Sequence, residues 1–253
     1  MNNALAELEK YLRGQGPAVL LFSGGMDSSL LLAVAARVLG GRLTALTFAG
    51  PHTVPGELAG SWALAHRLAV RHLVREFDPL VLPDFRENTP ARCYACKKAV
   101  IEAGWKMAGK LGAGVLGDGT NLDDLADFRP GLKAARELGV TSPLLAAGLG
   151  KAAIRELSRN LGLPVKSPQS CLATRFPYHT RLTREALSRV GRGEAWLRRR
   201  GFTWVRLRVR QDEGRLELPP EEWPAFLAPE VRGPFAALAA RLGLGPVYLD
   251  LPR

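Results

Sequence analysis

Residues 20–39 read LLFSGGMDSSLLLAVAARVL, and this stretch decides the fold. An apolar run over residues 17–22 leads into it, and a continuous run of this kind is typical of a buried parallel strand. A turn that contains Gly24 and Gly25 follows, and a helical pattern then runs from Ser28 to a stop at Gly40. The stretch therefore predicts a strand, a tight polar loop and a helix, which is the opening unit of an α/β sheet.

The same alternation continues beyond this unit. Apolar runs predict strands over residues 42–48, 72–77 and 114–117, and helical patterns predict helices over residues 57–70 and 97–111. This βαβα order indicates an α/β fold with a doubly wound parallel sheet, which we assign to residues 1–165.

The amino-acid composition of the sequence changes near residue 165. A loop rich in Pro, Ser and Thr over residues 166–183 leads to an arginine-rich segment. Residues 184–200 and 229–242 have helical patterns, residues 204–210 alternate as a half-buried strand does, and residues 215–218 and 247–251 are further strand candidates. We therefore expect a smaller C-terminal α+β domain over residues 166–253.

Composition narrows the class of protein. Of 253 residues, 47% are hydrophobic and 23% are charged, which excludes wholesale disorder and collagen-like structure. The formal net charge of +11 favours anionic partners such as nucleotides, phosphorylated small molecules or RNA. Three cysteines are too few for a disulfide scaffold. No secretory signal and no membrane-spanning stretch is visible, so we expect a cytoplasmic protein.

The segment SGGMDSS, residues 23–29, has the features of a phosphate-binding loop. Two glycines let the backbone approach a ligand closely, and the start of a helix attracts anions. Asp27 would suit a phosphate only through a bridging Mg²⁺ ion. The alternative is that Asp27 or Ser28 merely caps the helix. Neither the Walker A pattern nor the GxGxxG dinucleotide fingerprint is present.

The three cysteines are Cys93 and Cys96, which form a CxxC motif, and Cys171. The motif alone fits a redox pair, half of a zinc site or two unrelated thiols. A zinc site would need a fourth ligand, which His179 is placed to supply. A [4Fe–4S] cluster held by three thiolates would leave one iron open to an exogenous group. Residue spacing does not choose among zinc, a cluster and no metal.

Several stretches together resemble one family, the LarE-type ATP-dependent sulfur transferases, a branch of the PP-loop ATP pyrophosphatases. The resemblance covers most of the chain and includes SGGMDSS at 23–29, ARCYACKK at 91–98, GDGTNLDD at 117–124, DFRPGLKAARELGVTSPL at 127–144, KAAIREL at 151–157, LGLPVKSPQSCLATRFPYHTRLT at 161–183 and GFTWVRLR at 201–208.

The resemblance implies a reaction. ATP is cleaved between its α and β phosphates, a carboxylate of pyridinium-3,5-biscarboxylic acid mononucleotide is adenylated, and sulfur replaces AMP to give a thiocarboxylate, in nickel-pincer nucleotide cofactor biosynthesis. The family has a form in which one cysteine gives up its own sulfur, and a form in which three cysteines hold a [4Fe–4S] cluster that carries a sulfide. With Cys93, Cys96 and Cys171 all present, this sequence resembles the cluster form. The family also forms homo-oligomers.

The residue roles follow from the motifs and the resemblance. We expect the pyrophosphate and Mg²⁺ to be bound by Ser23, Gly24, Gly25, Asp27, Ser28 and Ser29. The loop after the fourth predicted strand lies at the carboxyl end of the sheet, where ligands bind in open α/β folds. We therefore assign nucleotide contacts to its residues Gly119, Thr120 and Asn121.

The C-terminal domain is expected to bind the mononucleotide. Arg206 and Arg208 are spaced by two on one strand face and match a phosphate-binding arginine pair of the family, although alternating arginines are more often a solvated face. The resemblance further places Cys171 at the sulfur-transfer position and Glu194 and Glu217 at acidic positions near the site. Arg175 is a candidate for polarising the activated carboxylate.

Two other function classes compete. Some PP-loop proteins thiolate tRNA, and the basic charge suits RNA binding. No zinc ribbon or recognisable RNA-binding domain is present, so a nucleic-acid substrate is the less favoured interpretation. A non-enzymatic nucleotide-binding or metal-storage protein is the other alternative, against which Asp27 and the CxxC motif argue.

Overall fold

The computed structural model describes residues 2–126, 130–165, 169–211 and 213–250, and it divides the chain into two compact units. The first unit comprises residues 1–50, 57–77 and 91–168. The second comprises residues 51–56, 78–90 and 169–253. Two short segments of the N-terminal part thus belong to the second unit, and no sequence signal indicated this.

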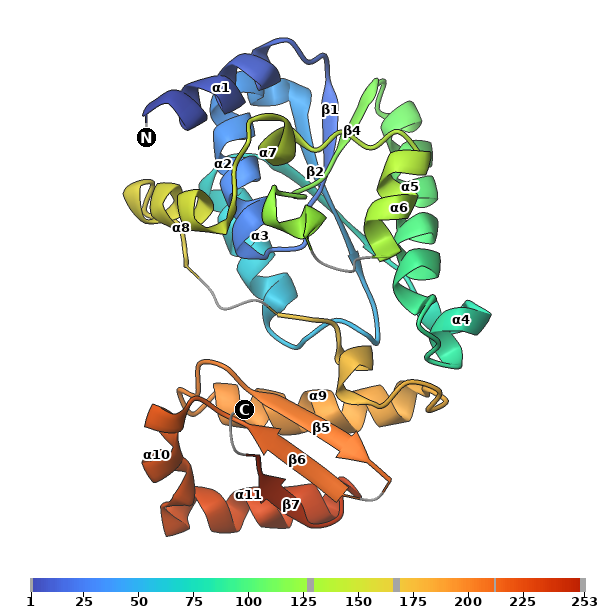
Figure 1. Cartoon of the computed structure of the whole chain (residues 1–253), viewed down its shortest axis with the longest axis vertical. Helices are drawn as coiled ribbons and strands as arrows, with labels where there is room; N and C mark the ends of the chain where they lie inside the picture. Colours follow the sequence, from blue (N-terminus) through green and yellow to red (C-terminus); the bar gives the residue numbers. More distant parts are fainter. Residues whose placement is uncertain (1, 127–129, 166–168, 212, 251–253) are drawn as a thin grey trace. The chain divides into compact units, whose positions relative to one another are not determined.

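The first unit is built on a sheet of four parallel strands in the order β3-β2-β1-β4 (Figure 1). The strands are β1 (Ala18–Leu21), β2 (Leu43–Ala49), β3 (Arg71–Glu76) and β4 (Val115–Gly117). All three pairings are parallel. The predicted parallel α/β sheet is therefore confirmed, because each predicted strand is present within a few residues of its expected place.

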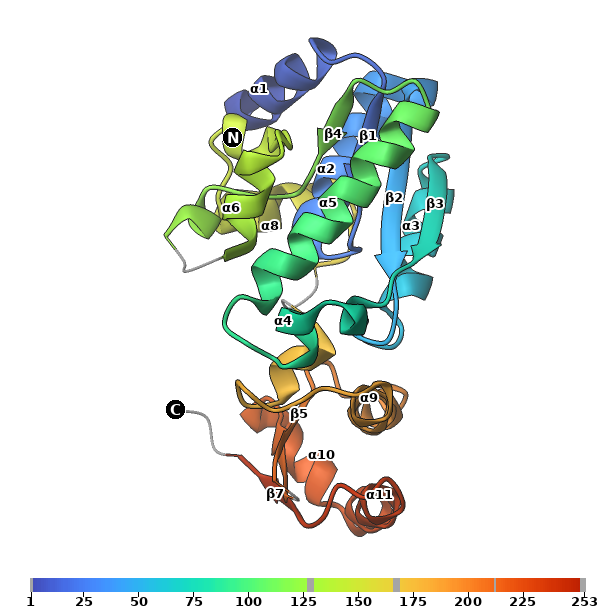
Figure 2. The same cartoon turned by 90° about the vertical axis from the view of Figure 1, so that its right-hand side faces the viewer.

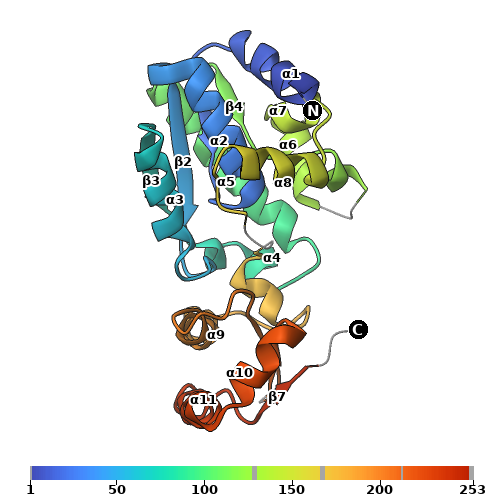
Figure 3. The ribbon, with the colours of Figure 1, turned by 90° about the vertical axis from the view of Figure 1, so that its left-hand side faces the viewer.

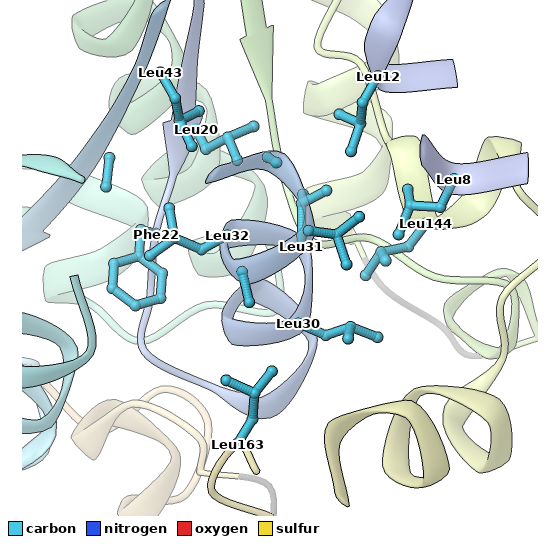
Figure 4. Close-up of a cluster of buried hydrophobic side chains, with 14 of the residues drawn as sticks. Leu8, Leu12, Leu20, Phe22, Leu30, Leu31, Leu32, Leu43, Leu144 and Leu163 are labelled. Carbon is cyan, nitrogen blue, oxygen red and sulfur yellow. The ribbon is translucent and has the colours of Figure 1, made fainter. Parts of the chain in front are cut away.

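Alternate residues of β1 face two separate apolar cores. Ala18 and Leu20 pack with α1 (Asn2–Arg13), α2 (Met26–Leu39), α3 (Glu57–Arg67), α7 (Pro143–Ala146) and α8 (Lys151–Asn160), as the leucines of Figure 4 show. Val19 and Leu21 pack with α5 (Arg92–Lys110) and α6 (Pro130–Glu137). Figure 3 shows α1, α2 and α8 on their face of the sheet, and Figure 2 shows α5 on the other. Helices on both faces confirm the doubly wound arrangement.

The second unit is a smaller α+β structure, as predicted. Its sheet has the order β5-β6-β7, formed by β5 (Arg206–Arg210), β6 (Glu213–Glu217) and β7 (Val247–Leu249). The β5–β6 pairing is antiparallel and joins the two predicted partner segments. The helices are α4 (Pro83–Arg86), α9 (Arg184–Arg198), α10 (Trp223–Leu227) and α11 (Pro229–Arg241). Figure 2 views α9 and α11 end-on, side by side next to this sheet.

Several helices were not predicted, namely α1, α4, α6, α7, α8 and α10. The helix expected over residues 97–111 begins earlier, at Arg92, so the CxxC motif lies inside its first two turns. Within the described part of the chain, none of the helices combines the length and the apolar character that crossing a bilayer requires.

Candidate functional site

The loop between β1 and α2 has the geometry of an anion site. Gly24 has a φ of 78°, a backbone conformation that favours glycine, and a Cβ there would lie 3.0 Å from Cβ of Ser61. Helix α2 begins at Met26, so the amide groups of its first turn have no partners within the helix. The Ser28 hydroxyl donates to the Gly25 carbonyl at 3.1 Å and lies 3.0 Å from the Ser23 hydroxyl. The predicted loop residues therefore lie together at the positive end of a helix dipole.

A cavity of about 300 Å³ opens beside this loop, entirely within the first unit. Its lining brings the phosphate loop together with the loop that follows β4. The residues that carry polar groups into it are Ser23, Asp27, Ser28, Lys97, Asp118, Thr120 and Asp124. Two separately predicted segments, residues 23–29 and 119–121, are thus joined in one site.

Gly119 is where the two loops touch. A Cβ at Gly119 would lie 2.9 Å from the backbone nitrogen of Ser28 and 3.1 Å from its Cα. Backbone atoms at that distance cannot rotate away as a flexible side chain can. The glycine therefore permits close packing of the post-β4 loop against the start of α2.

Gly119→Ala is expected to weaken binding of Mg²⁺–ATP by about tenfold or more, because the added methyl pushes apart the two loops that form the cavity. Titration calorimetry measures this. Gly109→Ala is the matched control, since Gly109 lies in α5 and a Cβ there meets nothing within 4 Å. Equal ATP affinity in the two variants would contradict the placement of the nucleotide in this cavity.

Asp27 is held in the site by two other side chains. The ammonium of Lys151, the first residue of α8, donates to Asp27 Oδ2, and Asn121 Nδ2 lies 3.3 Å from the same oxygen. Asp27 Oδ1 is buried and has no hydrogen-bond partner among the residues that the structure describes. A carboxylate oxygen left without a partner next to a helix N-terminus fits a ligand of a hard cation such as Mg²⁺. The side chains at this point therefore fit a Mg²⁺ ion of the kind predicted for this loop, and Mg²⁺ binding stays a prediction.

The sequence did not indicate a role for Lys97 and Asp118, which connect α5, the helix with the CxxC motif, to the loop that follows β4. Lys97 Nζ lies 2.7 Å from Asp118 Oδ2, and Asp118 Oδ1 accepts hydrogen bonds from the Thr120 amide and the Ser142 hydroxyl. Burial alone would raise the pKa of the Asp118 carboxyl, but the charge of Lys97 and the hydrogen bonds from Lys97 and Thr120 outweigh it and lower that pKa. Asp118 is therefore ionised at neutral pH and keeps the Lys97 ammonium at the cavity.

The cysteines are divided between the two units. Cys93 and Cys96 lie three residues apart in α5, which places them on one helix face in the first unit. Cys171 belongs to the second unit. Among the residues that the structure describes, no three His, Cys, Asp or Glu side chains form a group that could hold a metal ion. Two thiols at this helical spacing do fit two ligands of one metal centre.

Cys171 begins a tight turn, η4 (Leu172–Arg175). The Cys171 carbonyl accepts hydrogen bonds from the Thr174 amide at 3.0 Å and the Thr174 hydroxyl at 2.9 Å. The amide of Leu172 donates to the carbonyl of His52, in one of the inserted segments of the second unit. Backbone hydrogen bonds within the turn and to His52 therefore fix the conformation of the turn. His179 follows it with an exposed side chain and a positive φ of 66°.

Arg175 and Glu194 form a fully buried ion pair. Arg175 Nε donates to Glu194 Oε1 at 2.6 Å, and both side chains have an exposed fraction of 0%. Glu194 also accepts from Arg198 at 2.7 Å and from the amide of Leu207 in β5 at 3.0 Å. Arg175 Nη1 donates to the hydroxyls of Ser170 and Thr174. The pair thus ties the Cys171 turn to α9 and β5.

Glu194→Gln is expected to lower the free energy of unfolding by about 3–5 kcal/mol, because it leaves the buried Arg175 guanidinium without a counter-charge. Urea unfolding followed by tryptophan fluorescence measures this. Glu185→Gln is the matched control, since Glu185 is exposed in the first turn of the same helix. A loss below about 1 kcal/mol would mean that the pair does not anchor the turn.

The second unit has its own cavity, of about 590 Å³, next to the Cys171 turn. Arg208 and Glu217 line it and form an ion pair, and Arg208 Nη1 also donates to the Thr174 carbonyl at 3.1 Å. Arg175 contributes to the wall as well. Four residues predicted for the C-terminal domain therefore lie close to one another: Arg175, Glu194, Arg208 and Glu217. The guanidinium of Arg206, the other arginine predicted to bind phosphate, lies 4.7 Å from the centre of the Trp204 ring.

Comparison with known proteins adds three findings, although no family model matches the chain. An uncharacterized protein of Synechocystis is 37% identical over 99% of this chain and 94% of its own length. The pyridinium-3,5-bisthiocarboxylic acid mononucleotide synthase of Lactiplantibacillus plantarum is 34% identical over 88% of this chain and 82% of its own length. The NH(3)-dependent NAD(+) synthetase of Aeropyrum pernix is 32% identical over 62% of this chain and 58% of its own length. The first two relatives extend over both units.

Proposed function

The chain belongs to the family of the pyridinium-3,5-bisthiocarboxylic acid mononucleotide synthase, the LarE family, and on that premise we propose that it is an ATP-dependent sulfurtransferase. Its substrate is pyridinium-3,5-biscarboxylic acid mononucleotide, whose two carboxylates become thiocarboxylates. The observation that carries the proposal is the 300 Å³ cavity that is lined by the phosphate loop, Asp27 and Lys97, with Lys151 bound to Asp27.

The first step activates a carboxylate. A carboxylate oxygen attacks the α-phosphorus of ATP, the bond to the β-phosphate breaks, and pyrophosphate leaves. The amides at the start of α2 and the hydroxyls of Ser23, Ser28 and Ser29 bind the pyrophosphate. Asp27 would hold a Mg²⁺ ion, which would neutralise charge on the phosphates. Gly24 and Gly25 keep the loop open, and Gly119, Thr120 and Asn121 contact the nucleotide.

Lys97 and Lys151 supply positive charge to this step. Both side chains are about one-third exposed, with exposed fractions of 31% and 32%, and both ammonium groups contact carboxylates. Lys151 contacts Asp27 through Oδ2 and lies 4.0 Å from Asp124 Oδ1, so its charge stays beside the phosphate loop while Asp27 Oδ1 would be left for a Mg²⁺ ion. Preorganised cations of this kind stabilise charge that develops in a phosphoryl-transfer transition state.

The second step transfers sulfur. A sulfur nucleophile attacks the acyl carbon of the adenylate, AMP leaves with the bonding electron pair, and a thiocarboxylate remains. Cys93, Cys96 and Cys171 would hold a [4Fe–4S] cluster, which supplies a sulfide when bound. Arg175 positions the Cys171 turn through Ser170 and Thr174, and Glu194 positions Arg175. Glu217 holds Arg208 for the phosphate of the mononucleotide.

The alternative sulfur source is Cys171 itself. Its thiolate would displace AMP to form a thioester, and loss of the Cα proton with cleavage of the Cβ–S bond would then release the thiocarboxylate and leave dehydroalanine. Anaerobic iron and sulfide analysis distinguishes a cluster-bound sulfide from Cys171 as the sulfur source. About four iron atoms per chain, with loss of repeated turnover in Cys93→Ala and Cys96→Ala, would support the cluster. A colourless protein that completes one turnover and needs only Cys171 would support the sacrificial route.

The substrate class is tested by product analysis. The purified chain with Mg²⁺–ATP and the biscarboxylate should yield thiocarboxylate that mass spectrometry detects as exchange of oxygen for sulfur. The competing tRNA thiolation activity predicts salt-sensitive retention of tRNA and thiolated nucleosides instead. We further propose that residues 166–253 carry both substrate binding and the subunit contacts of a homo-oligomer. Light scattering of the full chain gives its mass in solution, and a monomer mass would contradict the subunit contacts.

A further inference from the structure

The peptide bond between Phe22 and Ser23, where the chain leaves β1 for the phosphate loop, is held by a side chain of β2. Phe22 follows the last residue of β1, and its amide donates to the Leu46 carbonyl at 2.8 Å. Its carbonyl accepts a hydrogen bond of 2.6 Å from the buried hydroxyl of Thr47. Both backbone polar groups of Phe22 are therefore fixed to β2 immediately before the loop begins.

His72 of β3, the strand at the edge of the sheet, is the second partner of this hydroxyl. Its Nε2 lies 2.8 Å from Thr47 Oγ1, and its ring packs edge-on against the Phe22 ring with the ring centres 5.7 Å apart. The Thr47 hydroxyl has a single hydrogen, which it donates to the Phe22 carbonyl, so Nε2 of His72 must donate in the second bond. A chain of hydrogen bonds thus runs from His72 through Thr47 to Phe22.

The surroundings of the other ring nitrogen of His72 favour the same tautomer. Nδ1 is buried and has no hydrogen-bond partner among the residues that the structure describes. A proton on Nδ1 would therefore be a buried donor without an acceptor, which is unfavourable. Burial lowers the pKa of His72, so the ring is neutral at neutral pH. The neutral ring carries its one proton on Nε2, where Thr47 accepts it.

The fixed carbonyl also determines where the amide of Ser23 points. A trans peptide unit is planar, so its C=O and N–H groups point in opposite directions. Because Thr47 holds the Phe22 carbonyl toward β2, the Ser23 amide is directed away from β2. This amide has no hydrogen-bond partner within the described part of the chain, and Ser23 is exposed and lines the 300 Å³ cavity. The phosphate loop therefore begins with an available, oriented donor.

We propose that Thr47 and His72 are positioning residues of the phosphate loop, which hold the peptide bond before Ser23 so that its amide donates to pyrophosphate. The inference rests on the proposed function, in which this loop binds the pyrophosphate of ATP. Leu46 and Phe48 line the cavity, whereas Thr47 between them and His72 do not. Thr47 therefore acts through the Phe22 carbonyl, and His72 acts by keeping the Thr47 hydrogen on that carbonyl.

The role of the hydroxyl is tested by titration calorimetry with Mg²⁺–pyrophosphate. Thr47→Val keeps the size of the side chain but removes the hydroxyl, and is expected to weaken binding about tenfold. Thr47→Ser restores the hydroxyl and should bind within about twofold of the wild type. Thr44→Val is the matched control, since Thr44 is buried in the same strand. Equal affinity of Thr47→Val and the wild type, equal losses in Thr47→Val and Thr44→Val, or no rescue by serine overturns the proposal.

The role of His72 is tested without any nucleotide by nitrogen-15 NMR of the histidine rings. The wild type should show a neutral His72 with its proton on Nε2, and the signal is assigned by its absence in His72→Gln. Thr47→Val should abolish this preference, because the acceptor of the Nε2 proton is gone. A proton on Nδ1 in the wild type overturns the role of His72.

Mg²⁺–ATP titrations of the same proteins separate this inference from the proposed function. A wild type that binds neither Mg²⁺–ATP nor Mg²⁺–pyrophosphate refutes the proposed function, and the positioning role is lost with it. A wild type that binds both ligands while Thr47→Val binds them equally well refutes the positioning role alone.

Discussion

Cys171→Ser is expected to abolish thiocarboxylate formation and to leave pyrophosphate release from ATP in place. In the proposed mechanism the thiol delivers or helps to hold the transferred sulfur, whereas the phosphate loop and Asp27 belong to the other unit. The turn keeps its shape because its contacts use the Cys171 carbonyl and the Leu172 amide, which serine retains. Mass spectrometry of the product and a pyrophosphate assay measure the two steps separately.

Cys93→Ser and Cys96→Ser complete the comparison. If all three variants lose repeated turnover, the sulfur passes through a shared centre. If only Cys171→Ser loses a single turnover, the cysteine is the donor itself. Thiocarboxylate formed at the wild-type rate by Cys171→Ser would refute the role of this residue in either form.

Asp27→Asn is expected to lower the rate of pyrophosphate release by roughly a hundredfold or more, which corresponds to about 3 kcal/mol of transition-state stabilisation. The amide keeps the shape of the side chain and an acceptor for Lys151, but it removes the negative charge that we propose for Mg²⁺ binding. The rate is measured over a range of Mg²⁺ concentrations, and the variant should need far more of the ion. Glu7→Gln on the exposed side of α1 is the matched control.

A rate within about threefold of the wild type for Asp27→Asn would contradict the assignment of Mg²⁺ to Asp27. If the rate stays low at high Mg²⁺ concentration, Asp27 acts through its contact with Lys151 and not through Mg²⁺. In that case Lys151→Ala should reproduce the loss.

The fold could be predicted largely because its signals are local. The apolar run before Ser23, the Gly24-Gly25 turn and the helix that follows belong to one continuous stretch, so strand, loop and helix could be assigned together. Helix α8 was missed although Ile154 and Leu157 are buried in the core, because only a few apolar residues mark its inner face. The inserted segments 51–56 and 78–90 were missed because membership of the second unit depends on long-range contacts.

The site could be predicted only in part, for a related reason. Residues 23–29 and 119–121 each carry a local pattern, and their meeting follows from the parallel sheet. Lys97 and Lys151 are single lysines whose role depends on the carboxylates opposite them, Asp118 and Asp27. The sequence marked them only through the family-like stretches that contain them, ARCYACKK for Lys97 and KAAIREL for Lys151. The contacts of Thr47 with Phe22 and His72 needed the order of three neighbouring strands, which a pattern along one strand does not supply.

The central claim is that the 300 Å³ cavity activates a carboxylate with ATP. The most direct measurement is pyrophosphate release by the purified chain with Mg²⁺–ATP, with and without pyridinium-3,5-biscarboxylic acid mononucleotide. We expect release that depends on the biscarboxylate and is accompanied by an equal amount of AMP. Release of inorganic phosphate and ADP, or no release of pyrophosphate when the biscarboxylate is present, would contradict the account.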